Sequence, residues 1–315
     1  MGWIAHKVVL CLRSPMHIGV GKVGNLQRTR LYVAGRNLWG ALTARITRDD
    51  DSEGKPHPGE YQEVGCRVRK ELAFTYFFPT VDEAGDKPLF PHLDTKGGWG
   101  YGRDGNGTPR MDASTFRYRF LSTYASTALD YTAQSAQEAS LHEVECLLPH
   151  TRNDKPVYLT GYIFQAEGSD LDWKGALTHL QIGGERGYGW GRVEVATLDK
   201  IEKDEVHLFS TGHVAHLDGP HVYVRLAEDQ PVLAHTLAAP FEDRMCCGDD
   251  EPPIVRSEVA RIQGPVEPLV GRETTQKGRF GVRLSQARIC YAPGARVKQA
   301  ISVQIGPYGV WEGAP

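Results

Sequence analysis

The chain has 315 residues, of which 40% are hydrophobic and 24% charged, and its formal net charge is −3. This balance is typical of a soluble globular protein, and the length is enough for about two domains. No run approaches the ~18 apolar residues of a membrane helix and no signal peptide is visible, so we expect a cytoplasmic protein with no membrane partner.

The first elements of the chain predict a strand, a glycine-rich loop and a helix. Residues 3–12 are rich in Val, Ile and Leu and indicate a strand, whereas residues 16–27 are rich in Gly. Asn37 is placed to cap a helix that runs to about Thr47, with apolar residues recurring every four positions on one face.

Residues 49–112 predict a long, irregular insertion. Pro56 and Pro58 interrupt its acidic beginning, and only residues 68–78 favour a strand. Its later part is rich in Gly and Pro and carries the aromatic and basic side chains of Trp99, Tyr101, Arg103 and Arg110. A loop of this kind suits a strand of nucleic acid, and a surface insertion without a ligand is the alternative.

The elements after the insertion repeat the pattern of the first ones. Residues 115–120, 141–148 and 157–166 favour strands, residues 171–180 favour a helix, and residues 192–196 favour a further strand. With the insertion set aside, the order is β-α-β followed by β-α-β. This is the split β-α-β order of the ferredoxin-like fold, which RNA-recognition domains share.

We therefore predict an α+β fold of two tandem ferredoxin-like (RRM-like) domains. The first covers residues 1–200, with its insertion at about 49–112, and the second, residues 201–315, is diverged and β-rich. A spacing echo favours a second copy, because Tyr32-x-x-Gly35-x5-Ala41 recurs as Tyr291-x-x-Gly294-x5-Ala300.

The basic residues are concentrated in two stretches. Met1 to Arg48 contains eight Lys or Arg and no acidic residue, and Arg272 to Lys298 contains seven Lys or Arg against Glu273 alone. A charge run is usually a solvated face. Two acid-poor stretches in an acidic protein instead favour one localised phosphate-binding surface.

The sequence offers no metal or cofactor motif. Its six cysteines form no Cys-x-x-Cys pair, and no His pair has zinc-finger spacing. The dense acidic cluster Asp49-Asp50-Asp51 has the composition of a solvated loop. We therefore expect neither a metal ion nor a cofactor.

Glycine, arginine and aromatic residues come together in the segment from Gly183 to Arg192, which we call the glycine loop. Glycine lets a loop fold back and lets another backbone come close, while exposed N–H groups and Arg bind phosphate and Tyr or Trp stacks a base. A Walker loop or dinucleotide fingerprint lies between a strand and a helix, whereas this loop follows a helix and precedes a strand. A glycine-rich turn without a ligand is the alternative.

Three stretches in this order resemble the CRISPR-associated RAMP superfamily, whose members build RNA-guided interference complexes. They are the glycine loop, Pro15 to Gly21 (PMHIGVG) and Tyr32 to Leu42 (YVAGRNLWGAL), and they span the first two-thirds of the chain. The mid-chain glycine loop and the tandem halves are most similar to the subunit that caps the 5′ handle of the guide RNA in type III-like complexes, including type III-D and type VII.

The resemblance implies a non-catalytic RNA-binding subunit of a CRISPR ribonucleoprotein effector complex, which serves antiviral defence. Its partners would be the guide crRNA, neighbouring RAMP backbone subunits and, through the guide, the target nucleic acid. The RNA-binding residues that we predict are His17, Gly19, Gly21, Lys22, Arg28, Arg30, Arg36, Asn37, Trp39, Gly183, Gly184, Arg186, Gly187, Tyr188, Gly189, Trp190, Arg192, Arg272, Lys277 and Arg279.

Catalytic and scaffold alternatives stay open at this point. Metal-free RNA cleavage needs a base, an acid and a cation, and His17, Lys22 and Tyr32 have these chemistries in a guide-processing endoribonuclease. In that branch of the family the glycine loop lies near the C-terminus, whereas about 120 residues follow it here. Backbone subunits that cut target RNA use a loop Asp, for which the candidates are Asp94, Asp104 and Asp112. A third alternative is a scaffold that touches only protein.

Overall fold

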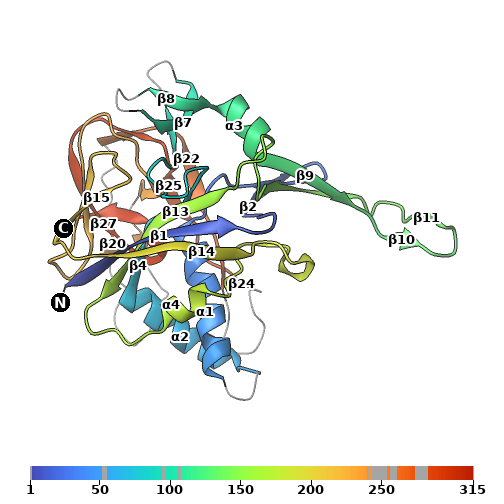
Figure 1. The fold of residues 1–315 in the computed structure, drawn as a ribbon, viewed down its shortest axis with the longest axis horizontal. Helices are drawn as coiled ribbons and strands as arrows, with labels where there is room; N and C mark the ends of the chain where they lie inside the picture. The colour runs from blue at the N-terminus through green and yellow to red at the C-terminus, as the bar shows by residue number, and fades with distance from the viewer. Residues whose placement is uncertain are drawn as a thin grey trace.

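The computed structural model describes residues 2–51, 55–93, 97–104, 108–239, 241–242, 254–255, 261–273 and 283–314. The fold is α+β, with mostly strands and few helices (Figure 1). Within these residues no helix is both long enough and apolar enough to span a membrane.

An antiparallel sheet of five strands forms the centre of the first half. Its path is β14-β1-β13-β4, with β5 also paired to β13. The strands are β1 (Trp3–Leu12), β4 (Leu72–Phe74), β5 (Phe78–Thr80), β13 (Tyr158–Ala166) and β14 (Val193–Ile201). The predicted strands at 3–12, 157–166 and 192–196 are confirmed as β1, β13 and β14.

Both faces of this sheet are covered, which explains why its strands are nearly continuous apolar runs. Ile163 of β13 packs in the cluster that contains the helical residues Leu38 and Leu42. Its neighbour Phe164 points to the other face and packs in a cluster with Val224 and Val303 of the second half. The two halves of the chain therefore share a core across the sheet.

Three helices gather on one face of the sheet (Figure 1). They are α1 (Gly35–Asp50), α2 (Pro58–Glu71) and α4 (Trp173–Leu177). Helix α1 confirms the predicted helix but begins after Ala34, without a side-chain cap. Asn37 therefore lies within its first turn, and the prediction that Asn37 caps the helix was wrong.

Two local predictions failed because helix signals were misinterpreted. Pro58 was expected to break structure, but it stands at the start of α2, where proline needs no hydrogen-bond partner and Glu60 completes a capping box with His57. Residues 115–120 were expected to form a strand, but they belong to α3 (Ala113–Phe120), which Asp112 caps by accepting from Thr115 N–H at 2.9 Å.

The predicted irregular insertion contains ordered elements. Besides α2, β4 and β5, it forms a three-stranded meander of β6 (Pro91–Leu93), β7 (Trp99–Arg103) and β8 (Pro109–Asp112). Tyr101 of this meander stacks on Phe116 of α3 at 4.2 Å between ring centroids. The described part of the insertion thus packs on the body of the protein.

A second four-stranded sheet, in the order β2-β3-β12-β9, extends into an arm that projects from the body (Figure 1). Its strands are β2 (Gly19–Val23), β3 (Leu26–Thr29), β9 (Leu121–Ser126) and β12 (His142–Leu147), and the arm continues through β10 (Leu129–Asp130) and β11 (Ser135–Ala136). Tyr131 near the tip is 86% exposed. The strand predicted at 141–148 is confirmed as β12, whereas no pattern in the sequence indicated the arm.

The second half is built on an eight-stranded sheet, in the order β15-β16-β17-β27-β28-β18-β25-β22. The strands are β15 (Glu205–Leu208), β16 (His213–His216), β17 (Tyr223–Leu226), β18 (Thr236–Leu237), β22 (Val266–Leu269), β25 (Arg288–Tyr291), β27 (Ile301–Ile305) and β28 (Trp311–Gly313). Short pairs add β19 (Phe241–Glu242) with β20 (Ile254–Val255), β21 (Ile262–Gln263) with β26 (Arg296–Val297), and β23 (Arg272–Glu273) with β24 (Arg283–Leu284). Where a copy of α1 would follow Gly294, the chain forms β26 and β27, so the spacing echo does not predict a helix there.

Candidate nucleic-acid interface

The glycine loop packs its backbone against residues 13–17, so the structure brings together two stretches that the sequence analysis singled out separately. Gly184 N–H donates to the His17 carbonyl oxygen at 2.8 Å, and Gly191 N–H donates to the Pro15 carbonyl oxygen at 2.7 Å. A Cβ on Gly183 would overlap the His17 carbonyl, and φ at Gly183 is +96°. Glycine is required here because two backbones touch and the local conformation is left-handed.

The tip of the glycine loop faces solvent. A single 3-10 turn, Arg186–Tyr188, forms between two left-handed residues, Glu185 and Gly189. Tyr188 is 72% exposed, and Arg186 is exposed beside it. A Cβ on Gly187 would meet no atom within 4 Å. The stem therefore fixes the loop, while the tip presents a cation and an aromatic ring.

Trp190 anchors the loop and is not available to a base. It is 9% exposed, packs with Val144 and Cys146, and meets Tyr124 edge-on at 5.9 Å between ring centroids. Of the two aromatic residues that we predicted to stack on a base, only Tyr188 is accessible. Trp190 instead connects the loop to β12 and to the base of the arm.

The β2–β3 hairpin lies beside the glycine loop, because the buried ring of His17 lies between them. Positions for a Cβ on Gly19 and on Gly184 are both 3.3 Å from atoms of the His17 ring. All five residues of β2 are exposed, including Gly21 and Lys22. Within the described part of the chain, no hydrogen bond or ion pair engages the side chains of Lys22, Arg186 or Arg192. We call the surface formed by Lys22, Arg186, Tyr188 and Arg192 the loop surface.

The predicted catalytic group is not assembled. His17 is 5% exposed and donates from Nδ1 to the Glu145 carbonyl oxygen at 2.8 Å. Tyr32 is buried, and burial raises the pKa of its hydroxyl. Lys22 is exposed on β2. In the described chain, no hydrogen bond links any two of His17, Lys22 and Tyr32.

Acids pair with most of the cations in the first basic stretch, and most of these acids come from distant parts of the chain. Among the residues that the structure describes, ion pairs join Lys7 with Asp86, Arg13 with Glu194, Arg28 with Glu145, Arg30 with Glu267 and Arg45 with Asp49. The buried carboxylate of Glu145 also accepts from Arg117 and from Thr29 N–H. A stretch without acids in the sequence therefore does not form a surface as basic as its composition suggests, because acids from other segments pair with its cations.

Arg36, Trp39 and Arg272 lie at a separate place, around Tyr308. The Arg36 guanidinium lies over the Tyr308 ring at 4.7 Å and donates to the Arg272 carbonyl oxygen at 3.3 Å. Trp39 Nε1 donates to the Gly65 carbonyl oxygen at 2.8 Å, so its indole is a structural contact. The two basic stretches meet at Arg36 and Arg272, while Lys277 and Arg279 lie outside the described residues.

Arg30 belongs to a buried cluster that joins the two halves, which we call the Arg30 cluster. It donates to the Tyr32 hydroxyl at 3.0 Å and to Glu267 at 2.8 Å. His235 lies 2.5 Å from Glu267 through Nε2 and 2.7 Å from the Tyr76 hydroxyl through Nδ1. A neutral His235 that donates to Glu267 and accepts from Tyr76 satisfies every one of these groups.

The electrostatics of the Arg30 cluster agree with this assignment. Burial lowers the pKa of His235, which keeps its imidazole neutral. Burial alone would raise the pKa of Glu267, but the hydrogen bond from His235 and the charge of Arg30 lower it to about 2. Glu267 is thus an ionised partner of Arg30, and Arg30 is committed to the interior.

Comparisons with known proteins give a likeness of fold. No family model matches the chain, and no curated protein matches it. A chain of the type III-B Cmr-beta complex bound to cognate target RNA and AMPPnP, solved by cryo-EM, is similar at a TM-score of 0.53 and 12% identity. The same kind of complex bound to cognate target RNA contains a chain similar at 0.50 and 12% identity. Each match covers 93% of this chain and 86% of the other, so nearly the whole chain has the fold of a chain in a type III-B Cmr-beta complex.

Proposed function

We propose that this chain is an RNA-binding subunit of a CRISPR ribonucleoprotein effector complex of the type III kind, and that its loop surface holds the 5′ handle of the guide crRNA. The observation that carries the proposal is the construction of the glycine loop. Its stem is fixed by backbone hydrogen bonds to residues 13–17, while its tip presents Arg186 and Tyr188 to solvent. The likeness to a chain of an RNA-bound complex supports the same assignment.

The chemistry of the loop surface fits a single-stranded sugar-phosphate chain. Arg186, Arg192 and Lys22 can donate to phosphate oxygens, and Arg offers a planar fork for two of them. The exposed ring of Tyr188 can stack on an unpaired base, which is sequence-tolerant because every base has a π-face. Because the loop is already fixed by its stem, binding orders few additional backbone torsions.

We further infer that residues 1–200 form a ferredoxin-like domain and that the arm contacts a neighbouring backbone subunit. The first inference is supported by the order β14-β1-β13-β4 and by the helices on one face. The second is supported by the exposed apolar side chains of Tyr124, Leu129 and Tyr131 on the projecting arm.

The test is a binding measurement with RNA derived from the CRISPR repeat of the host. Arg186→Ala and Arg192→Ala should each weaken binding by ~1–3 kcal/mol, and the double variant should also flatten the dependence of binding on salt. Arg45→Ala is the matched control, because Arg45 pairs with Asp49 on α1, away from the loop. Unchanged affinity and salt dependence in the double variant would favour a scaffold that touches only protein.

We also propose that the chain does not cleave RNA. The support is the burial of His17 and Tyr32, since a base and an acid must reach the 2′-hydroxyl and the leaving oxygen. Incubation of the purified chain with repeat RNA in the absence of metal tests this. Specific scission by the wild type that disappears in His17→Ala would overturn it and establish the guide-processing alternative.

A further inference from the structure

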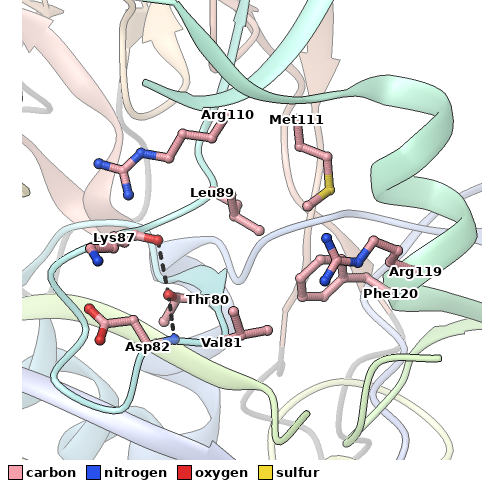
Figure 2. Close-up of a pocket in the computed structure, with 9 residues that line it drawn as sticks. All are labelled: Thr80, Val81, Asp82, Lys87, Leu89, Arg110, Met111, Arg119 and Phe120. Atoms are coloured by element: carbon pink, nitrogen blue, oxygen red, sulfur yellow. Dashed lines mark hydrogen bonds between the residues drawn. The ribbon is translucent and has the colours of Figure 1, made fainter. Parts of the chain in front are cut away.

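A pocket of about 330 Å³ opens between α3, β8 and the loop that follows β5, and it belongs to none of the surfaces described above. Its lining has three cations, Lys87, Arg110 and Arg119, and one carboxylate, Asp82. Figure 2 shows Lys87 and Arg110 on one side of the view and Arg119 on the other, with Leu89 and Met111 between them. The pocket is therefore both cationic and partly apolar.

Arg119 is the residue of the pocket that points to a ligand. Its Nε is buried, and within the described part of the chain it has no hydrogen-bond partner. A buried donor on a charged group without a partner is unfavourable and rare in native proteins, and it calls for an unseen water, ion or ligand. No carboxylate forms an ion pair with Arg119 in the described residues.

The other groups of the pocket are held in place without neutralising it. Arg110 Nε donates to the Arg103 carbonyl oxygen of β7 at 2.5 Å. Thr80 Oγ1 donates to the Lys87 carbonyl oxygen at 2.9 Å and accepts from Asp82 N–H at 3.0 Å (Figure 2). Asp82 in turn accepts from Asp86 N–H at 2.9 Å. The loop is thus closed on itself, and its only pocket carboxylate is engaged with backbone.

We propose that this pocket binds a nucleotide, with its phosphate against Arg119 and its base against the accessible apolar side chains of Val81 and Met111. The volume is at the lower end of small-molecule pockets, about 300–1,000 Å³, which is more than a lone phosphate needs. Guanidinium groups pair with phosphate by charge-assisted hydrogen bonds, and aliphatic, thioether and aromatic side chains suit a base. The nucleotide comes either from the free pool or as one unit of an RNA strand.

Calorimetric titration of the full chain with AMP, adenosine and inorganic phosphate tests the ligand class. AMP should bind, and adenosine and phosphate should each bind more weakly because each fills only part of the pocket. Arg119→Gln should weaken AMP binding by about ten- to a hundredfold, the value of one charge-assisted hydrogen bond. Arg45→Gln is the control, since Arg45 pairs with Asp49 on α1 and neither residue lines the pocket, and it should retain wild-type affinity.

A competition arm distinguishes the two sources of nucleotide. If the pocket holds one unit of a strand, an oligouridylate should displace AMP, and Arg119→Gln should weaken the oligonucleotide as well. If it holds a free nucleotide, the variant should lose AMP and keep its affinity for the oligonucleotide. The double variant of Arg186 and Arg192 should keep AMP binding in either case. The pocket proposal and the proposed role of the loop surface are therefore tested independently of each other.

The melting temperature of an Arg119 variant tests the proposal independently of the affinity measured for AMP. Because the Arg119 Nε has no partner, Arg119→Met should leave the melting temperature of the ligand-free chain unchanged or raise it, and should abolish the rise produced by AMP. A fall in the melting temperature of the free variant would show a structural role and overturn the proposal. Failure of AMP to bind, with loss of a protein partner in Arg119→Gln, would assign the pocket to a carboxylate of another subunit and also overturn it.

Discussion

Arg186 at the tip of the glycine loop and Arg30 after β3 were both predicted to bind RNA, but the structure gives them opposite surroundings. Arg186 is exposed with no acidic partner in the described chain, whereas the side chain of Arg30 is 13% exposed and paired with Glu267. Arg30 lies in a stretch of sequence without acids, whereas Arg186 directly follows Glu185. The difference arises from residues more than 200 positions away from Arg30, and it separates an exposed cation from a cation that holds the fold together.

Removing Glu267 is expected to give the largest effect on stability. Glu267→Ala leaves Arg30 buried without its counter-charge and removes the acceptor of His235, so the free energy of unfolding should fall by ~3–5 kcal/mol. Urea denaturation followed by circular dichroism measures it. Arg186→Ala is the comparison and should change stability by less than about 0.5 kcal/mol. Equal losses in the two variants would mean that Arg186 is structural as well.

The two aromatic residues of the glycine loop should separate in the same way. Trp190→Ala removes a buried indole from its contacts with Val144 and Cys146 and should cost ~3 kcal/mol of stability. Tyr188→Ala should leave stability unchanged and weaken RNA binding by ~1–3 kcal/mol, the range for one stacked base. Thermal unfolding and RNA titration of both variants check this. RNA affinity that is insensitive to Tyr188→Ala would remove stacking from the proposed role.

The glycines of the loop sharpen the distinction between its stem and its tip. Gly191 has φ of +76°, and a Cβ there would overlap the Ile182 carbonyl, so Gly191→Ala should destabilise the chain by ~1–3 kcal/mol. Gly187→Ala places its Cβ in open space and should change stability by less than about 0.5 kcal/mol. Denaturant midpoints of the two variants give the comparison directly. Similar midpoints would show that the stem tolerates displacement.

Local patterns predicted the elements that local patterns can specify. The apolar runs predicted β1 and β13 correctly because both faces of these strands are buried. The four-residue spacing predicted α1 correctly because one side of this helix is buried. Residues 115–120 misled, because the buried pair Phe116 and Phe120 is consistent with both an alternating strand and a helix turn. The Asp112 cap was the signal that distinguishes the two.

The site was predictable only in part, because its contacts are non-local. The sequence predicted that the glycine loop would approach another backbone, which is confirmed, but nothing in it identified residues 13–17 as the partner. The ion pairs of Arg28 and Arg30 depend on acids at 145 and 267 and could not be read from charge runs. The sequence did not predict the pocket at Arg119, because its lining comes from three separate segments. It indicated only that Arg110 is a basic residue of the insertion.

The pH dependence of stability should come from the interior, not from the loop surface. His235 has a pKa lowered by burial, and burial lowers the pKa of His213 to about 4, so both must gain protons on unfolding as the pH falls below about 6.5. Glu267, with a pKa lowered to about 2, contributes stability that is present above its unfolded value of about 4.5 and is lost as the pH falls from there toward 2.

Unfolding free energies measured by urea at a series of pH values should therefore decline below about pH 6.5, by no more than ~1.4 kcal/mol per pH unit for each group. Glu267→Gln should make the decline below about pH 4.5 less steep, because the variant lacks the contribution of this carboxylate while that of His213 remains. Arg186→Ala should follow the wild-type curve throughout, since its guanidinium is exposed and unpaired in the described chain. A wild-type curve that is flat between pH 7 and 4 would contradict the neutral, hydrogen-bonded state of His235, and with it the contrast between the buried and the exposed arginine.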